Sequence, residues 1–201
     1  MAATASPYGL RPVQLVGGLP YAGAIRSYAL ANNSASAFYF GSIVGLNASG
    51  DPAAIAASPL AGTVDGNSPI GIFMGCEYED NVKGFVNAQF FPANGITGGA
   101  KKVRFKILDA PNIVMQVQSI GTIAAGNIGK NIAMSTFAVG SAATGNSTAA
   151  CTATAAATAT LGLKIIGYVE KAGVSTAGDA FTDLFVIWNA GTHRYAQGAG
   201  L

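Results

Sequence analysis

The residues best suited to chemistry are few in this chain, and the first is its one histidine, His193. A Ser-His-Asp triad or a zinc site would have to be built around that imidazole. The two cysteines, Cys76 and Cys151, show no metal-ligand spacing with it. His193 also lies close to a glycine-rich end of the chain. We therefore interpret it as a surface or interface side chain rather than a catalytic one.

Three carboxylates gather after an apolar run, at Glu77, Glu79 and Asp80. A pair of carboxylates can carry out acid–base chemistry or bind a hard cation. A calcium loop would show the spacing Asp-x-Asp-x-Asp-Gly, which is missing here. The cluster is therefore interpreted as a solvated turn.

Other motifs that carry chemistry are absent from the sequence. It has no G-x-x-x-x-G-K-[ST] or G-x-G-x-x-G phosphate loop and no G-x-S-x-G nucleophile motif. Four of the eleven basic residues lie within 101–106, a spacing that favours a solvated strand face over an anion site. We expect no enzyme activity, no metal site and no cofactor.

The composition narrows the class of protein further. Of 201 residues, 50% are hydrophobic and only 10% are charged, with a net charge of +2. A disordered chain has few hydrophobic residues and a high net charge, the opposite of this composition. Nucleic-acid binding needs a larger excess of basic residues than a net charge of +2 provides. Two cysteines are too few for a disulfide scaffold, so we expect buried or incidental thiols. We predict no nucleic-acid partner.

A long charge-free stretch of 33 residues, 131–163, is rich in threonine, alanine and glycine. It lacks the bulky aliphatic density of a membrane helix, and the first residues lack the pattern of a secretion signal. We expect no membrane association and assembly in a cytoplasm. Solvated surfaces are usually charged, so charge-poor stretches such as this one are expected to be covered by neighbours. This predicts a homo-oligomer, a trimer ahead of a dimer, with the charged stretches 77–83 and 101–106 facing water.

The elements that must position these residues are short strands. The sequence predicts them at 24–30, 37–46, 69–76, 83–91, 102–108, 112–117, 157–163, 164–171 and 183–189, with one or two helical turns within 121–133. In 102–108 the alternation places Val103, Phe105 and Ile107 inward. The fold class is mainly β, a sandwich or barrel of short strands with an extended N-terminal arm and little helix.

The two ends of the chain differ from its middle. Residues 1–24 are interrupted by proline and glycine and predict an extended arm, ordered on a partner and loose without it. Residues 25–190 form one β-rich domain, or two subdomains divided near 100–120, and 191–201 form a mobile tail. The residues of the arm expected to contact a partner are Tyr8, Leu10, Arg11, Val13 and Leu15.

Several segments together resemble a known family. They are 7–13 (PYGLRPV), 71–78 (GIFMGCEY), 90–93 (FFPA), 106–111 (KILDAP), 115–118 (MQVQ), 144–147 (TGNS), 163–169 (LKIIGYV), 182–187 (TDLFVI) and His193. They are similar to structural proteins encoded near the major capsid gene of tailed bacteriophages, which serve as head decoration or cement proteins.

The resemblance implies a role on the virion. The chain would bind the outer surface of the major capsid protein lattice and stabilise the head by bridging subunits, since a ligand of the intact lattice stabilises it. The alternative is another virion component, a tail or fibre subunit or a displayed carbohydrate-binding module. Sugar binding favours exposed aromatic side chains, and we expect Trp188, which lies in an apolar run, to belong to the core.

Overall fold

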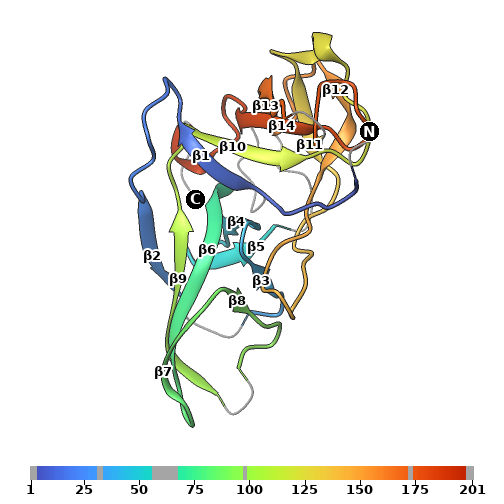
Figure 1. Cartoon of the computed structure of the whole chain (residues 1–201). Coiled ribbons are helices and arrows are strands. Elements are labelled where there is room, and N and C mark those ends of the chain that lie inside the picture. Colours follow the sequence, from blue (N-terminus) through green and yellow to red (C-terminus); the bar gives the residue numbers. More distant parts are fainter. Residues whose placement is uncertain (1–3, 31–33, 56–67, 97–98, 172–173, 198–201) are drawn as a thin grey trace.

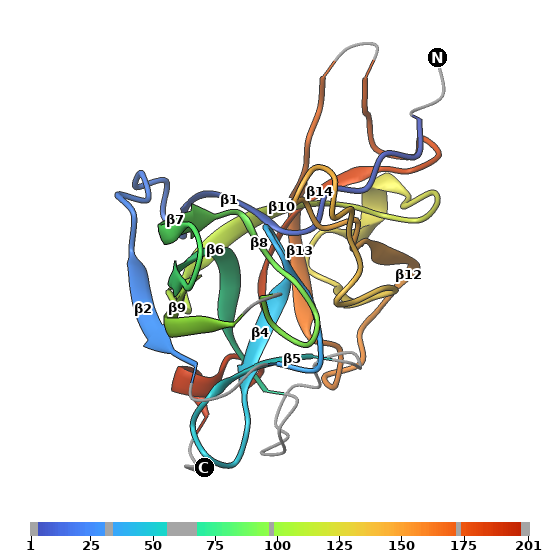
Figure 2. The ribbon, with the colours of Figure 1, turned by 90° about the horizontal axis from the view of Figure 1, so that it is seen from below.

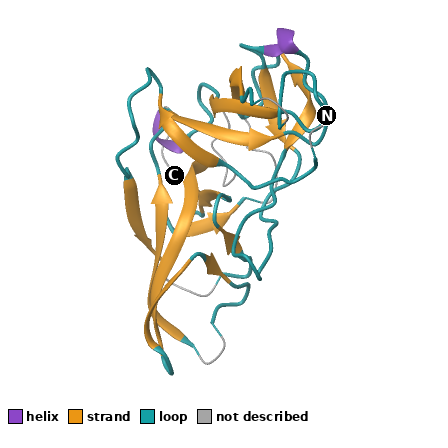
Figure 3. Ribbon diagram, in the orientation of Figure 1, coloured by secondary structure: helices purple, strands orange, loops and turns teal. Residues whose placement is uncertain are grey.

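A computed structural model describes residues 4–30, 34–55, 68–96, 99–171 and 174–197. Within these residues the chain forms fourteen strands and two short 3-10 helices, Ala125–Asn127 and Arg194–Ala196. Strands and loops account for almost all of the ribbon (Figure 3). The expected fold class, mainly β with little helix, is confirmed.

The first of the two large sheets, sheet A, is antiparallel and six-stranded. Its order is β1 (Arg11–Leu15), β10 (Ile113–Gln118), β14 (Asp183–Trp188), β13 (Leu163–Tyr168), β11 (Asn131–Met134) and β12 (Cys151–Ala156). All but β1 come from the second half of the chain. The N-terminal strand β1 forms one edge of this sheet and β12 forms the other.

Sheet B is drawn from residues 25–108. Its order is β2 (Ile25–Ala29), β9 (Ala100–Leu108), β6 (Pro69–Asp80), β4 (Ile43–Leu46) and β5 (Pro52–Ala54), and β7 (Gly84–Ala88) also pairs with β6. A small third sheet pairs β3 (Phe38–Tyr39) with β8 (Phe90–Phe91). The chain passes from sheet B to sheet A between Leu108 and Ile113.

Two apolar clusters hold these layers together. The larger one joins sheet A to sheet B, since Met115, Ile165 and Trp188 of sheet A share it with Ile72 and Leu108 of sheet B. The other lies on the opposite side of sheet B, where aromatic rings of Phe38, Phe73, Phe91 and Phe105 pack edge to face. The strands of sheet A cross above those of sheet B (Figure 1), and Figure 2 shows the same layers from below.

Successive side chains of a pleated strand point to opposite faces, so the alternating pattern of 102–108 predicted the buried face of β9 correctly. Val103, Phe105 and Ile107 are buried at 7%, 0% and 0% exposure, as expected. The buried strand β6 approaches β9 closely, and a Cβ built on Gly71 would lie 2.0 Å from the Leu108 carbonyl oxygen. Only glycine fits at that position.

Other elements differ from the expected ones. The strand expected at 157–163 is wrong for 157–162: the Ala/Thr strand lies earlier, at Cys151–Ala156, and Leu163 begins β13. The 121–133 region forms one 3-10 turn and then strand β11 rather than a longer helix. Local composition does not fix where the strands and the 3-10 turn lie, because Ala, Thr and Gly recur throughout 121–163.

The C-terminal segment is packed where a mobile tail was expected. Thr192, His193 and Arg194 are at most 8% exposed. The Gln197 side-chain amide donates to Ser68 Oγ at 2.9 Å and to the Gly191 carbonyl at 2.9 Å. The prediction of a mobile tail is therefore wrong for 191–197, and 198–201 lie outside the described residues. Within the described part of the chain, no helix has the length and apolarity needed to cross a membrane.

Candidate partner interface

The N-terminal segment is docked onto its own domain. Leu10 is fully buried in the larger apolar cluster, and its N–H donates to the Gly41 carbonyl at 2.9 Å. The preceding N–H, of Gly9, donates to the Ala149 carbonyl at 3.1 Å. Gly9 has φ +75°, and a Cβ there would lie 2.7 Å from the Gly41 oxygen. The expectation of a loose arm is therefore wrong from Gly9 through β1.

A partly buried polar contact secures Tyr8 to sheet A. The Tyr8 hydroxyl donates to Asp183 Oδ1 at 2.9 Å, and the Arg11 guanidinium carbon lies 4.3 Å from the centre of the Tyr8 ring. Burial, reinforced by the Asp183 charge, raises the pKa of Tyr8, so the phenol stays protonated. Burial also raises the pKa of Asp183. Tyr8 and Arg11 thus stabilise each other within one chain.

The residues before Tyr8 are held by the side chain of Gln118. Its Oε1 accepts from the Ser6 N–H at 2.7 Å, and its Nε2 donates to the Thr4 carbonyl at 3.3 Å. The Gln118 side-chain amide thus makes two hydrogen bonds to the backbone of Thr4 and Ser6, of the kind that a neighbouring strand would make. The extended conformation expected for the arm is present, but its partner is the chain itself.

The five predicted contact residues divide into two groups. Leu10 is inaccessible, Leu15 packs against the core, and Tyr8 is half-buried against Asp183. Assigning Leu10 to a partner interface is therefore wrong. Val13 is 41% exposed and Arg11 is also exposed. Regular alternation would place Arg11, Val13 and Leu15 on one face. The register shift between Pro12 and Gln14 in the pairing of β1 with β10 breaks that alternation, so Leu15 can reach the core while Arg11 and Val13 stay exposed.

Beyond β1 the chain reverses in a tight turn, which we name the N-terminal turn (Val16–Leu19). Leu15 N–H donates to the Leu19 carbonyl at 2.8 Å, and Gly17 and Gly18 adopt positive φ. Val16 is 50% exposed and Leu19 is 63% exposed. This turn and Val13 form an apolar surface at the end of β1.

A second exposed apolar surface lies on a projection of sheet B, which we name the β-ribbon (76–88 and 100–105). Strands β6, β7 and the first half of β9 extend away from the body of the molecule (Figure 1). Val82, in the turn between β6 and β7, is 86% exposed, and Phe85 is 69% exposed. These are the two most exposed large apolar side chains of the described residues.

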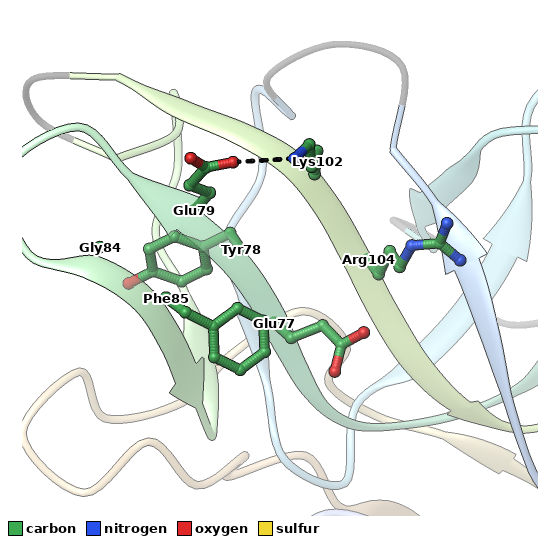
Figure 4. Close-up of a pocket in the computed structure, with 7 residues that line it drawn as sticks. All are labelled: Glu77, Tyr78, Glu79, Gly84, Phe85, Lys102 and Arg104. Carbon is green, nitrogen blue, oxygen red and sulfur yellow. Dashed lines mark ion pairs between the residues drawn. The ribbon is translucent and has the colours of Figure 1, made fainter.

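The exposed face of the β-ribbon carries rows of cross-strand neighbours. One row is Phe85–Glu79–Lys101, and the next is Asn87–Glu77–Arg104. A hollow of about 460 Å³ on this face is lined by Phe85 and Glu79 of the first row, by Glu77 and Arg104 of the second, and by Tyr78, Gly84 and Lys102 (Figure 4).

Ion pairs neutralise both glutamates of this face. Lys102 Nζ lies 3.2 Å from Glu79 Oε2, and Lys106 Nζ lies 3.3 Å from Glu77 Oε2. Both pairs are solvent-accessible and therefore weak. Glu77 and Glu79 lie in a strand, so the interpretation of the acidic cluster as a turn is wrong for these two.

Asp80 ends β6 and orders the turn that follows. Its Oδ1 accepts from the N–H of Val82 at 2.7 Å and of Lys83 at 2.9 Å. These backbone hydrogen bonds, the one from Lys83 foremost, lower the pKa of Asp80. The carboxylate is thus used in turn formation.

His193 is buried, at 1% exposure, so its interpretation as a surface or interface side chain is wrong. Its Nδ1 accepts from the Tyr195 N–H at 3.2 Å, and its ring centre lies 5.8 Å from that of Trp188. Burial disfavours the charged imidazole and lowers the pKa to about 4. Trp188 is 5% exposed, which confirms its place in the core.

A polar network fastens the C-terminal segment to sheet B. The Tyr28 hydroxyl donates to Asp109 Oδ2 at 2.8 Å and also contacts the Tyr195 hydroxyl. Arg26 Nε lies 3.0 Å from the same Asp109 oxygen. The network joins β2, the end of β9 and the C-terminal helix, and every contact in it is internal to the chain.

The remaining candidates for chemistry are dispersed. Cys76 and Cys151 are free and buried, as expected, and burial raises the pKa of both, that of Cys76 to about 12. Among the described residues there is no group of three or more His, Cys, Asp or Glu side chains placed to hold a metal.

The sequence contains a signal for the exposure of Phe85, which was not among the predicted site residues. Phe85 is in phase with Asn87 and Gln89 in an alternating stretch, which indicates that it faces solvent. The outward position of Lys101 had no such signal. It depends on a register shift between β6 and β9, which only the paired strands reveal.

Comparisons with known proteins identify no relative. No family model, no curated protein and no solved structure matches this chain.

Proposed function

We propose that this chain is a capsid decoration, or cement, protein of a tailed bacteriophage. It binds the outer surface of the major capsid protein lattice and bridges neighbouring subunits. Its place is the outside of the virion, after assembly in the host cytoplasm, and it acts as a homo-oligomer, a trimer ahead of a dimer. The resemblance of its sequence motifs to this family motivates the proposal.

The observation that carries the proposal is the separation of two exposed apolar surfaces on one chain. The N-terminal turn lies at one end of the molecule and the tip of the β-ribbon at the other (Figure 1). Val16 and Leu19 are exposed on the first, and Val82 and Phe85 on the second. Two contact surfaces at opposite ends suit a protein that bridges subunits, because each chain can engage two of them at once.

The β scaffold supports this role physically. Both surfaces project from strands that continue into a buried core, so they are held in place before binding. Pre-organised contacts avoid the entropy cost of ordering a loose segment. Each contact is weak, but the contacts are repeated many times over the lattice. Because the protein binds the intact shell, the combined binding free energy stabilises that shell.

The test is association with intact heads. Heads purified with the protein should carry it at a stoichiometry close to that of the major capsid protein. The double variants V16S/L19S and V82S/F85S should each reduce this occupancy at least tenfold. The control variant I128S changes a side chain of similar exposure, 57%, away from both surfaces and should bind normally. Absence of the wild-type chain from heads would refute the proposal.

A further inference from the structure

The β-ribbon collects basic side chains on one face by means of a break in its strand register. Glu77 lies opposite Arg104, yet Glu79 lies opposite Lys101, so β9 has one more residue than β6 between these pairs. Lys102 in this bulge has φ +53°, a conformation that non-glycine residues rarely adopt. Bulges of this kind redirect side chains.

The effect of the bulge is to bring Lys101 to the face of Lys102 and Arg104. In a regular strand Lys101 would point to the same side as Val103, into the core side of the sheet. Instead it is exposed and lies across from Glu79. With Lys106, four cations occupy one face of a projecting ribbon.

Two of these cations have no acidic partner within ion-pair distance in the described part of the chain. Glu79 is paired with Lys102, and Glu77 is paired with Lys106. Lys101 and Arg104 are left without a carboxylate, and the Arg104 guanidinium points away from Glu77 (Figure 4). The face therefore has a surplus of positive charge.

The arrangement also has a fitting shape. Lys101 and Arg104 stand in adjacent cross-strand rows beside the hollow of about 460 Å³, and Phe85 forms its wall on the β7 side. Side chains two apart on an extended chain are roughly 7 Å apart, which is also the spacing of adjacent rows on a sheet. Carboxylates at positions i and i+2 of an extended segment therefore match these two cations. Arginine can bind a carboxylate through two parallel hydrogen bonds.

We propose that this face of the β-ribbon binds an extended acidic segment of the protein that it docks on, with the pattern acid-x-acid. This deepens the proposed function and rests on it for the identity of the partner, the major capsid protein. One carboxylate pairs with Arg104 and the next with Lys101. Phe85 offers the bound segment an apolar contact on the β7 side of the hollow.

The first experiment uses the purified chain and the peptide acetyl-Glu-Ser-Glu-Ser-Glu-amide, with binding followed by backbone amide NMR shifts. Shifts should move in 101–104 and 77–79 and remain unchanged in β13. The double variant K101E/R104E should weaken binding at least tenfold. The matched control K130E/K171E carries the same charge change on other elements and should bind as the wild type does. The uncharged peptide with Gln in place of Glu should not bind.

Two results would overturn the inference. One is peptide binding that K101E/R104E and K130E/K171E weaken equally, since that would indicate only the overall charge. The other is tighter binding of duplex DNA at the same phosphate concentration to the same residues, since the site would then serve a nucleic acid.

Head binding separates this inference from the proposed function. Reduced occupancy of K101E/R104E on heads, with normal occupancy of K130E/K171E, supports both. If V82S/F85S loses occupancy while K101E/R104E keeps it, the acidic-segment site is refuted and the decoration function stands. If the wild type binds the peptide but never binds heads, the decoration function is refuted and the acidic-segment site stands.

Discussion

Leu10 offers a direct test of whether the N-terminal segment belongs to the core or to a partner interface. Its side chain is fully buried in the cluster that joins the two sheets, which also contains Ile43, Met115 and Trp188. Replacing it by alanine removes three carbons and leaves a cavity that the surrounding strands fill only in part. Such a change costs about 2–5 kcal/mol of unfolding free energy.

The effect of L10A can be measured by urea unfolding followed by the fluorescence of Trp188, the one tryptophan of the chain. That indole lies in the same cluster as Leu10 and reports on its loss. In a chain of this size, a loss of 3 kcal/mol corresponds to a fall in Tm of roughly 6–12 °C. The matched control is V13A, which is in the same segment but 41% exposed, and it should change the unfolding free energy by less than about 0.5 kcal/mol.

The comparison of L10A with V13A tests whether the N-terminal segment belongs to the core. Equal, small effects of both variants would show that the segment is loosely attached and would refute our account of it. A large effect of L10A alone means that deleting the N-terminal segment through β1 would also remove part of the fold. Such a deletion would then reduce head binding for reasons unrelated to contact, and V16S/L19S is the informative variant.

Three further predictions test the core. G71A should lower the unfolding free energy by several kcal/mol, because its Cβ would lie 2.0 Å from a backbone oxygen of β9, whereas G126A meets open space and should be tolerated; equal effects would contradict this packing. Because the pKa of His193 falls from 6.5 in the unfolded chain to about 4 when folded, the unfolded state binds the proton more readily. Stability should therefore be unaffected above pH 6.5 and fall by about 3 kcal/mol between pH 6.5 and 4, and H193Q should remove that part of the pH dependence; an unchanged profile would mean that the imidazole is not buried. Cys76 and Cys151 should react with Ellman's reagent only after unfolding, and rapid native-state reaction of either would contradict its burial.

The β-rich fold was predictable because its strands carry their own pattern. The segment 102–108 alternates polar and apolar residues, and the pleat turns that alternation into one buried face. The apolar run at 69–76 likewise became the central strand β6, which extends to Asp80. Its continuation was not predicted, since charged residues at 77–80 resemble a turn until a neighbouring strand supplies their partners.

The candidate site was predictable only in part. Val13 and Arg11 were expected at a surface and are exposed there, whereas Leu10 was expected with them and is buried. Proline and glycine in 1–24 indicate an extended chain, but they do not indicate what it lies against. The same extended segment can pair with a partner or with β10, and only the folded chain distinguishes the two.

The sequence by itself determined the fold class of this protein. Its low charge, short alternating strands and dispersed titratable residues follow from composition and local pattern, which need no knowledge of distant contacts. Tertiary structure alone decided the rest: Leu10 in the core, His193 buried beside Trp188, and Lys101 turned outward by the register of β9 against β6. These depend on contacts between residues far apart in the chain, or on the pairing of one strand with another, and no local pattern encodes either.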